Sequence, residues 1–230
     1  DAQESRGLGD VYKRQVTFTS ASEIEEEIKN KKVLFEGAQG IMLDLDSGTY
    51  PYVTSSTTTA YSASAADVTL TDDDTIMGVV KAYTSRVGEG EFPTELFDEE
   101  ADKLRKLGNE FGATTGRNRR VGWIDLAQLR YAIKKSKINS IVMTKADVLN
   151  GYDKVKVCVG YEIDGVEQKM PFISNDFKKA KPIYKEFDGW NDVFEVNFLK
   201  YMTFIEKELD TEISYVSYGP KTEEIMEKRD

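Results

Sequence analysis

The stretch Ser-Ile-Val-Met-Thr-Lys-Ala-Asp at residues 140–147 joins a short apolar run to a polar turn. Ile141, Val142 and Met143 form an uninterrupted triplet of the kind found in buried strands of α/β proteins. A lysine and an aspartate follow directly, where such a strand would end. Ligands of open α/β sheets bind beyond the carboxyl ends of the strands, so residues 144–147 are a candidate binding turn.

Strand and helix patterns alternate outward from this stretch. Further strands are predicted at 33–35, 82–87, 155–163 and 213–217, with a hairpin turn at Asp164-Gly165. Amphipathic helices are predicted at 99–107, 124–135 and 198–209, a short acidic helix opens at the capping-box pattern of Ser22 and Glu25, and the run Asp72–Asp74 favours another helix start. The order predicts an α/β fold, a partial, mostly parallel sheet flanked by helices, with an antiparallel hairpin.

Composition excludes several classes of function. The 230 residues carry 41 acidic and 31 basic side chains, a net charge of -10, which opposes general binding to nucleic acid. Histidine is absent, so Ser-His-Asp and Cys-His catalysis cannot operate within this chain. The remaining chemistry must use carboxylates, amides, hydroxyls and basic side chains.

The single cysteine, Cys158, lies in an apolar alternating run, so it is predicted to be a buried packing residue in a reducing compartment. No run approaches the roughly 18 apolar residues of a membrane span, and no signal pattern opens the chain, so we expect a cytoplasmic protein with no membrane partner. Residues 1–15 lack periodicity and are interpreted as a non-native segment, and organised structure is predicted within residues 16–230.

The turn Thr144-Lys145-Ala146-Asp147 has the chemistry of a guanine site. A carboxylate beyond a strand end can accept both the ring N–H and the exocyclic amine of guanine, which adenine does not offer together. The aliphatic stem of Lys145 can cover the flat face of the base. A lysine and an aspartate at this spacing also occur in ordinary solvated loops, so the motif alone leaves both interpretations open.

A second candidate is the loop Gly112–Arg120, in which small and hydroxyl residues precede three arginines. Small residues allow close approach, and the planar guanidinium binds carboxylate and phosphate oxygens in pairs. The loop therefore indicates a site for anionic substrates, and the alternative is a basic surface loop paired with acids.

A third candidate joins the turn Glu36–Gly40 to the run Thr54-Ser55-Ser56, where an amide and several hydroxyls could hold a base edge and a phosphate. Asp44 and Asp46 alternate with leucines, which fits one polar face of an extended segment or a metal site. No glycine-rich phosphate loop of the Walker type follows a strand.

Taken in order, these segments resemble adenylosuccinate synthetase. The matching stretches are VLFEGAQG at 33–40, SGTYPYVTSS at 47–56, KAYTSRVGEGEFPTEL at 81–96, NEFGATTGRNRRVGWIDL at 109–126, TKADVLNG at 144–151, KVCVGYEIDG at 156–165 and SYGP at 217–220. The resemblance covers residues 33–220 and implies a fold related to the P-loop nucleoside triphosphatases, belonging to the C-terminal portion of such an enzyme.

The resemblance also implies roles for individual residues. Those expected to contact inosine monophosphate (IMP) are Gln39, which is also the expected catalytic residue, Thr54 and Arg117. Those expected to bind L-aspartate are Ala113, Thr114, Thr115, Gly116, Arg117 and Arg119. Those expected to bind GTP are Arg119, Lys145, Ala146, Asp147, Ser217, Tyr218 and Gly219.

The implied reaction is the GTP-dependent ligation of L-aspartate to IMP, giving adenylosuccinate, GDP and phosphate. The family's phosphate loop, with its catalytic aspartate and magnesium ligand, and its catalytic histidine have no match here. We therefore expect no metal ligand in this chain, Mg²⁺ bound by the missing N-terminal portion, and no turnover by the chain alone. The full protein is expected to be a homodimer. Two alternatives remain: a related synthetase that uses another purine nucleotide such as dGMP, and a noncatalytic module that binds guanine nucleotides.

Overall fold

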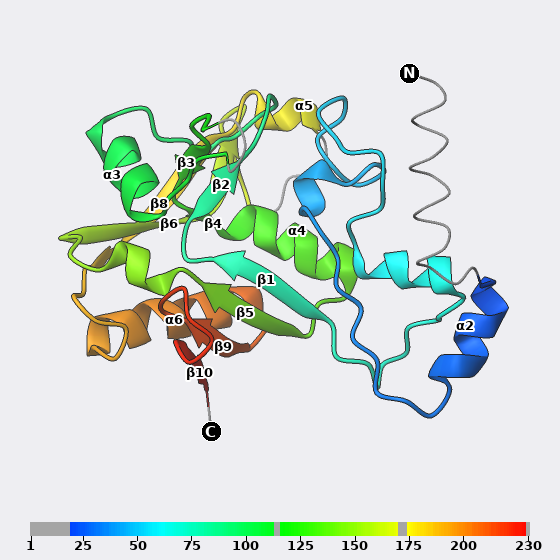
Figure 1. Ribbon diagram of the computed structural model, residues 1–230. Helices are drawn as coiled ribbons and strands as arrows, with labels where there is room; N and C mark the ends of the chain where they lie inside the picture. The colour runs from blue at the N-terminus through cyan, green and yellow to red at the C-terminus, as the bar shows by residue number, and fades with distance from the viewer. Residues whose placement is uncertain (1–18, 113–115, 170–173, 229–230) are drawn as a thin grey trace, which may run out of the picture.

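The computed structural model describes residues 19–112, 116–169 and 174–228, except for the side chains of residues 174 and 175 (Figure 1). The helices are α2 (Ala21–Ile28), α3 (Glu99–Leu107), α4 (Leu126–Ser136), α5 (Ser174–Phe177) and α6 (Val196–Leu209), with short 3-10 turns η1 (Ile41–Leu43), η2 (Ala60–Ala66) and η3 (Ala146–Leu149). The strands are β1 (Met77–Lys81), β2 (Thr84–Arg86), β3 (Arg120–Gly122), β4 (Ile124–Asp125), β5 (Ser140–Thr144), β6 (Lys154–Ile163), β7 (Val166–Gln168), β8 (Lys181–Asp188), β9 (Ile213–Ser217) and β10 (Ile225–Glu227).

The strands form three sheets. The first has the order β1-β5-β9-β10, in which β1, β5 and β9 are parallel and β10 is antiparallel to β9. In the second sheet β4 runs parallel to β6, and β7 and β8 pair antiparallel with β6. Strands β2 and β3 make a separate antiparallel pair. The predicted α/β class is confirmed, with parallel strands in the part of the first sheet that leads to the candidate site.

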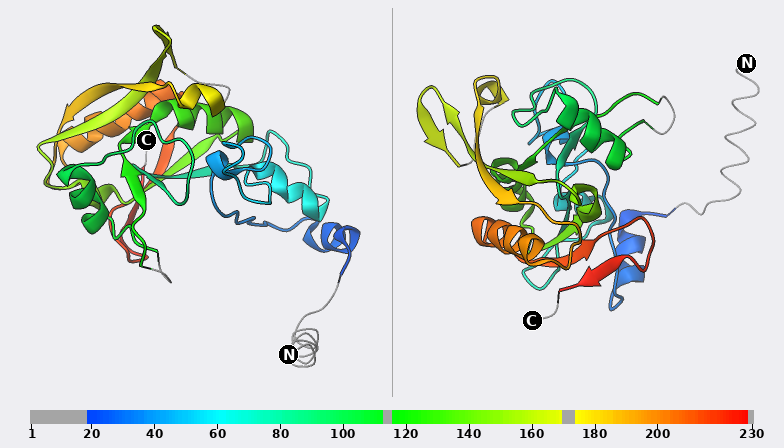
Figure 2. Two further views of the ribbon diagram at one scale, coloured as in Figure 1. Left: turned by 90° about the horizontal axis from the view of Figure 1, so that it is seen from above. Right: turned by 90° about the vertical axis from the view of Figure 1, so that its left-hand side faces the viewer.

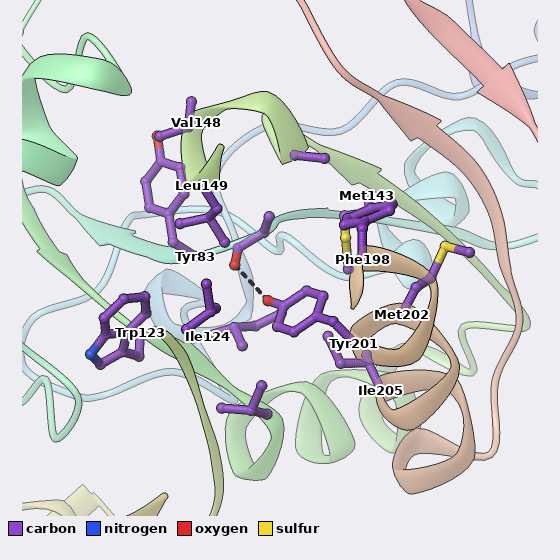
Figure 3. Close-up of a cluster of buried hydrophobic side chains, with 14 of the residues drawn as sticks. Tyr83, Trp123, Ile124, Met143, Val148, Leu149, Phe198, Tyr201, Met202 and Ile205 are labelled. Carbon is purple, nitrogen blue, oxygen red and sulfur yellow. Dashed lines mark hydrogen bonds between the residues drawn. The ribbon is translucent and has the colours of Figure 1, made fainter. Parts of the chain in front are cut away.

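One apolar core joins the first sheet to α4, α6 and the second sheet (Figures 1 and 2). Trp123, Met143, Phe198 and Tyr201 are among its fully buried large side chains, and each such side chain stabilises the fold by about 1.5–3 kcal/mol. The hydroxyl of Tyr201 donates to the carbonyl of Ala82 at 2.8 Å (Figure 3). Helix α6 is thereby fixed to the segment between β1 and β2, close to the candidate site.

Most local predictions are confirmed. Helix α3 has the predicted bounds, the alternating run forms β6, and the turn at Asp164-Gly165 leads into β7. Cys158 is fully buried, as predicted, and burial raises the pKa of its thiol. Among the described residues, no helix has both the length and the apolar character needed to cross a bilayer.

Three local predictions are wrong. Residues 33–35 form no strand and are exposed, Leu34 by 87%. A strand needs a neighbour for its N–H and C=O groups, and within the described residues no ladder includes this segment. The first helix is capped by Ser20 with Glu23, not by Ser22 with Glu25. No helix follows Asp72–Asp74, because Asp74 accepts the N–H of Thr71 at 2.7 Å to close a turn and the chain then enters β1.

Candidate functional site

The predicted guanine turn lies at the carboxyl end of β5. The Thr144 hydroxyl donates to the carbonyl of Val80 at 3.2 Å, which fixes the strand end against β1. Lys145 adopts a left-handed conformation with φ 57°, and Asp147 falls in the first turn of η3. Ala146 is fully buried, so it anchors the turn to the core while the two charged neighbours remain half-exposed.

The predicted turn Ser217-Tyr218-Gly219 lies beside it. Strand β9 is parallel to β5, and Val216 is the register partner of Met143, so both strands end at the same edge of the sheet. The Ser217 hydroxyl donates to the carbonyl of Gly219 at 3.1 Å, and the N–H of Tyr218 donates to the carbonyl of Glu224. The two stretches expected to read guanine therefore meet, although they are far apart in the sequence.

The arginine loop is closed at its base by backbone hydrogen bonds. The N–H of Gly112 donates to the carbonyl of Arg117 at 2.8 Å, and the N–H of Arg119 donates to the carbonyl of Glu110 at 2.9 Å. Gly116 has φ 62°, a left-handed conformation suited to glycine. Ala113, Thr114 and Thr115, which were predicted to bind aspartate, lie outside the described residues.

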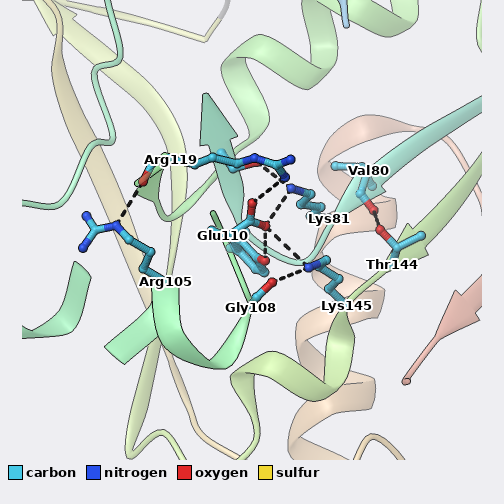
Figure 4. A network of polar contacts seen from close by, with 10 residues as sticks. Val80, Lys81, Arg105, Gly108, Glu110, Arg119, Thr144 and Lys145 are labelled. Carbon is cyan, nitrogen blue, oxygen red and sulfur yellow. Dashed lines mark hydrogen bonds and ion pairs between the residues drawn. The ribbon is translucent and has the colours of Figure 1, made fainter. Parts of the chain in front are cut away.

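A buried carboxylate connects the arginine loop to the guanine turn (Figure 4). Glu110 is 0% exposed and accepts hydrogen bonds from Lys81 at 2.7 Å and Arg119 at 3.0 Å. The Lys145 ammonium lies 3.7 Å from the same carboxylate and donates to the carbonyl of Gly108. Arg119 and Lys145 are thus neighbours in space. Glu110 is not among the residues that the sequence motifs predicted for a site.

The ionisation of this cluster follows from burial and hydrogen bonding. Burial alone raises the pKa of Glu110, but hydrogen bonds from Lys81 and Tyr83 and the positive charge of Lys81 outweigh it, so the pKa lies below its ordinary value. Burial lowers the pKa of Lys81, and the hydrogen bond to Glu110 and the negative charge of Glu110 offset part of this lowering. Burial and the bond to Glu110 raise the pKa of Tyr83, so its hydroxyl stays a donor.

Thr54 belongs to a separate group of contacts in residues 40–58, and Gln39 directly precedes that group in the chain. Gln39 has φ 63° and is exposed, and the N–H of Thr54 donates to the carbonyl of Leu43 at 2.7 Å. The carboxylate of Asp44, which is 1% exposed, accepts the N–H groups of Ser47 at 2.8 Å and Thr58 at 2.6 Å. Asp44 therefore organises a loop.

Arg86 connects residues 37–58 to β2. Its guanidinium donates to the Thr49 hydroxyl at 3.0 Å and to the carbonyl of Glu89 at 2.8 Å. Arg86 is the register partner of Arg120 in the β2-β3 ladder, and Arg120 directly follows Arg119 in the chain. The loop that Arg86 binds is therefore fixed to the strand that begins next to Arg119. The hydrogen bonds described above do not connect Gln39 or Thr54 to the Glu110 cluster, so their convergence with Arg117, Arg119, Asp147 and Ser217 stays a prediction.

No metal centre is defined by the described residues. Within residues 19–112, 116–169 and 174–228, no group of three or more His, Cys, Asp or Glu side chains is arranged to hold a metal ion. The metal interpretation of Asp44 and Asp46, one of the two that the sequence left open, has no support here, since Asp44 accepts backbone N–H groups.

By fold and by the charged side chains at its strand ends, the chain is of the α/β class in which ligands meet the carboxyl edge of a parallel sheet. A family model described as adenylosuccinate synthetase matches residues 3–226. The chain belongs to the adenylosuccinate synthetase family.

Individual relatives agree with the family model. An adenylosuccinate synthetase of Finegoldia magna is 98% identical over 220 residues, which is 96% of this chain and 53% of that protein. An adenylosuccinate synthetase of Thermotoga maritima is 49% identical over 230 residues, which is 99% of this chain and 57% of that protein. The chain spans about half the length of the curated relatives it matches.

Solved structures show the same fold. Fully ligated adenylosuccinate synthetase from Plasmodium falciparum is 37% identical with a TM-score of 0.85, covering 91% of this chain and 53% of that one. Succinoaminodeoxyadenylate synthetase of cyanophage S-2L, bound to dGMP and dATP, has a TM-score of 0.58 at 16% identity and covers 92% of this chain and 51% of that one, a likeness of fold alone.

Proposed function

We propose that this chain forms part of an enzyme of purine nucleotide synthesis that ligates L-aspartate to IMP with GTP, giving adenylosuccinate, GDP and phosphate. Family membership supports the reaction class, and the stretches of sequence that resemble the family support the substrates. The observation that carries the proposal is the meeting of Lys145 and Arg119 at the Glu110 carboxylate. It brings a guanine turn and an arginine loop to one edge of the sheet.

The proposed roles divide the site into three parts. Lys145, Ala146 and Asp147, with the turn Ser217–Gly219, hold guanine. Arg119 lies between GTP and L-aspartate, and residues 113–117 together with Arg119 bind the amino acid. Gln39, Thr54 and Arg117 contact IMP.

The chemistry proposed for the family transfers the γ-phosphoryl group of GTP to O6 of IMP, after which the aspartate amine displaces phosphate. Such transfer depends on positioning and charge neutralisation more than on acid–base strength. The arginines of this chain would neutralise substrate oxygens, and Gln39 would act by orienting the nucleotide. Mg²⁺ would supply charge neutralisation at the phosphates, and we expect its ligands outside this chain.

Two further proposals concern the whole protein. We propose a homodimer located in the cytoplasm, without a membrane or nucleic-acid partner. The acidic balance of the chain, its net charge of -10 and its single buried cysteine support a reducing, aqueous setting.

Titration calorimetry of the 230-residue chain with GDP and with ADP tests the guanine site. We expect measurable GDP binding and at least tenfold weaker ADP binding, because adenine lacks the paired donors that Asp147 can accept. Equal affinity for both nucleotides, or no binding of either, would contradict the proposal.

The dGMP-using alternative stays open. Competition by IMP and by dGMP, measured on a full-length relative that carries this half, separates it from the IMP reaction. The noncatalytic alternative predicts GDP binding without any effect of IMP.

A further inference from the structure

Glu110 is a charged side chain to which no ligand contact is proposed. It lies, however, among side chains that are proposed to bind ligands. It is completely buried, and its two carboxylate oxygens accept hydrogen bonds from Lys81, Tyr83 and Arg119. The Lys145 ammonium lies 3.7 Å from the same carboxylate (Figure 4). These partners come from β1, the segment before β2, the arginine loop and the turn after β5. One carboxylate therefore holds together chain segments that are widely separated in sequence.

The cluster contains more cations than the carboxylate neutralises. The side chains of Lys81, Arg119 and Lys145 are 26%, 34% and 36% exposed, whereas Glu110 is 0% exposed. Their inner faces are thus bound to Glu110 while their outer faces remain open. An excess of positive charge held in a fixed geometry suits a polyanionic ligand, because no reorganisation is needed on binding.

The position of Glu110 is itself fixed by packing. The Tyr83 ring is buried and its hydroxyl donates to Glu110. Gly108 approaches so closely that an added Cβ would lie 2.3 Å from that hydroxyl. The Glu110 carboxylate therefore cannot follow a moving lysine or arginine, and it acts as a fixed point for both.

Building on the proposed function, we propose that Glu110 is a positioning residue that sets Lys145 for guanine and Arg119 for the anionic substrates. Without this carboxylate the three cations would repel one another, and their side chains would spread into solvent. The role is electrostatic and directional. It differs from a packing role, which any side chain of the same volume would fill.

GDP binding to the 230-residue chain, measured by calorimetry, tests the link to Lys145. We further propose that Arg119, placed between GTP and L-aspartate, contacts the γ-phosphate of GTP. GDP carries guanine but lacks that phosphate. We expect Glu110→Gln and Lys145→Met each to weaken GDP binding about tenfold, and the double variant to bind no more weakly than either single one. Two results would overturn the inference. One is GDP binding about a hundredfold weaker in the double variant, the product of the two single effects, and the other is unchanged GDP binding in Glu110→Gln.

The same measurement with GTP tests the link to Arg119. Glu110→Gln is expected to reduce the ratio of GTP to GDP affinity, and in an Arg119→Met background this reduction should disappear. A ratio that Glu110→Gln leaves unchanged would overturn this half of the inference.

Glu208→Gln is the matched control. Glu208 also pairs with two cations, Arg130 at 2.6 Å and Lys169 at 3.7 Å, but it lies at the end of α6 outside the proposed ligand contacts. It should leave both affinities within twofold of the unsubstituted chain. An equal loss in Glu208→Gln would show a general effect of breaking an ion pair and would count against Glu110.

Glu110→Asp covers the case in which Glu110→Gln does not fold. It keeps the charge and retracts the carboxylate by one methylene, so we expect a folded chain with weakened GDP binding. If circular dichroism shows both variants unfolded, Glu110 is a folding residue and the inference fails. If the unsubstituted chain binds no GDP, the proposed function fails first, a result distinct from unchanged binding in the variant.

Discussion

The guanidinium of Arg86 donates to the hydroxyl of Thr49 across 3.0 Å, and it is the connection between the loop that carries Thr54 and the β2-β3 pair. Arg86 is 8% exposed and also reaches the carbonyls of Tyr52 and Glu89. This buried cation fixes the loop together with the hydroxyl of Tyr131, which donates to the carbonyl of Ser47 at 2.7 Å.

Arg86→Met should destabilise the chain by about 2–4 kcal/mol, because buried acceptors lose charged donors. Urea unfolding measures the loss, and limited proteolysis should cut residues 44–58 sooner than in the unsubstituted chain. Lys154→Met serves as a control, since Lys154 and Asp188 form an exposed pair, and exposed pairs contribute little to stability. Unchanged stability in Arg86→Met would contradict this account of the loop.

Asp125 gives a pH-dependent contribution to stability. Burial raises its pKa from 3.8 to about 6, although Tyr161 and the N–H groups of Ala127 and Gln128 donate to it. A pKa raised by folding means that the folded state holds the proton more tightly. This contribution is therefore fully present below about pH 4 and is lost as pH rises through about 6.

Asp125→Asn should remove that dependence. The amide oxygen can still cap α4. The cost of a buried charge at neutral pH, roughly 3 kcal/mol for a pKa raised from 3.8 to about 6, disappears. We expect the melting temperature of the variant, relative to the unsubstituted chain, to rise between pH 4.5 and pH 7.5. A difference that stays constant across this range would show that Asp125 does not titrate there.

Asp147→Asn should abolish the preference for guanine. The carboxylate that accepts two donors becomes an amide that accepts only one, so GDP affinity should fall by about tenfold to a hundredfold while ADP affinity stays the same. Asp153→Asn is the control, because Asp153 is exposed, lies six residues further along the chain, and accepts the N–H of Gly189 with its backbone carbonyl. Retained discrimination between GDP and ADP in Asp147→Asn would place the guanine site elsewhere.

The chain alone should not form adenylosuccinate. Purified chain is supplied with IMP, L-aspartate, GTP and Mg²⁺, and product is followed by absorbance. The full-length Finegoldia magna relative serves as the positive control. Steady turnover by the chain would show that this half holds a complete catalytic centre.

The sequence by itself determined the local elements and the motifs. Helix α3 and the β6-β7 hairpin follow from periodicity and turn residues over short windows, because each pattern states which face is buried. The guanine turn was predicted at the end of β5 for the same reason, and the segment lies there. Residues 33–35 show the limit of such patterns, since an apolar triplet does not specify a partner strand.

Only the tertiary structure decided which charges meet. Glu110 lies in the stretch Asn-Glu-Phe-Gly, where nothing local marks it as different from an exposed acid. It becomes the centre of a cation cluster because β1, the arginine loop and the turn after β5 end at one edge of the molecule. Burial and long-range pairing are properties of the folded chain, and they convert an ordinary carboxylate into a fixed electrostatic point.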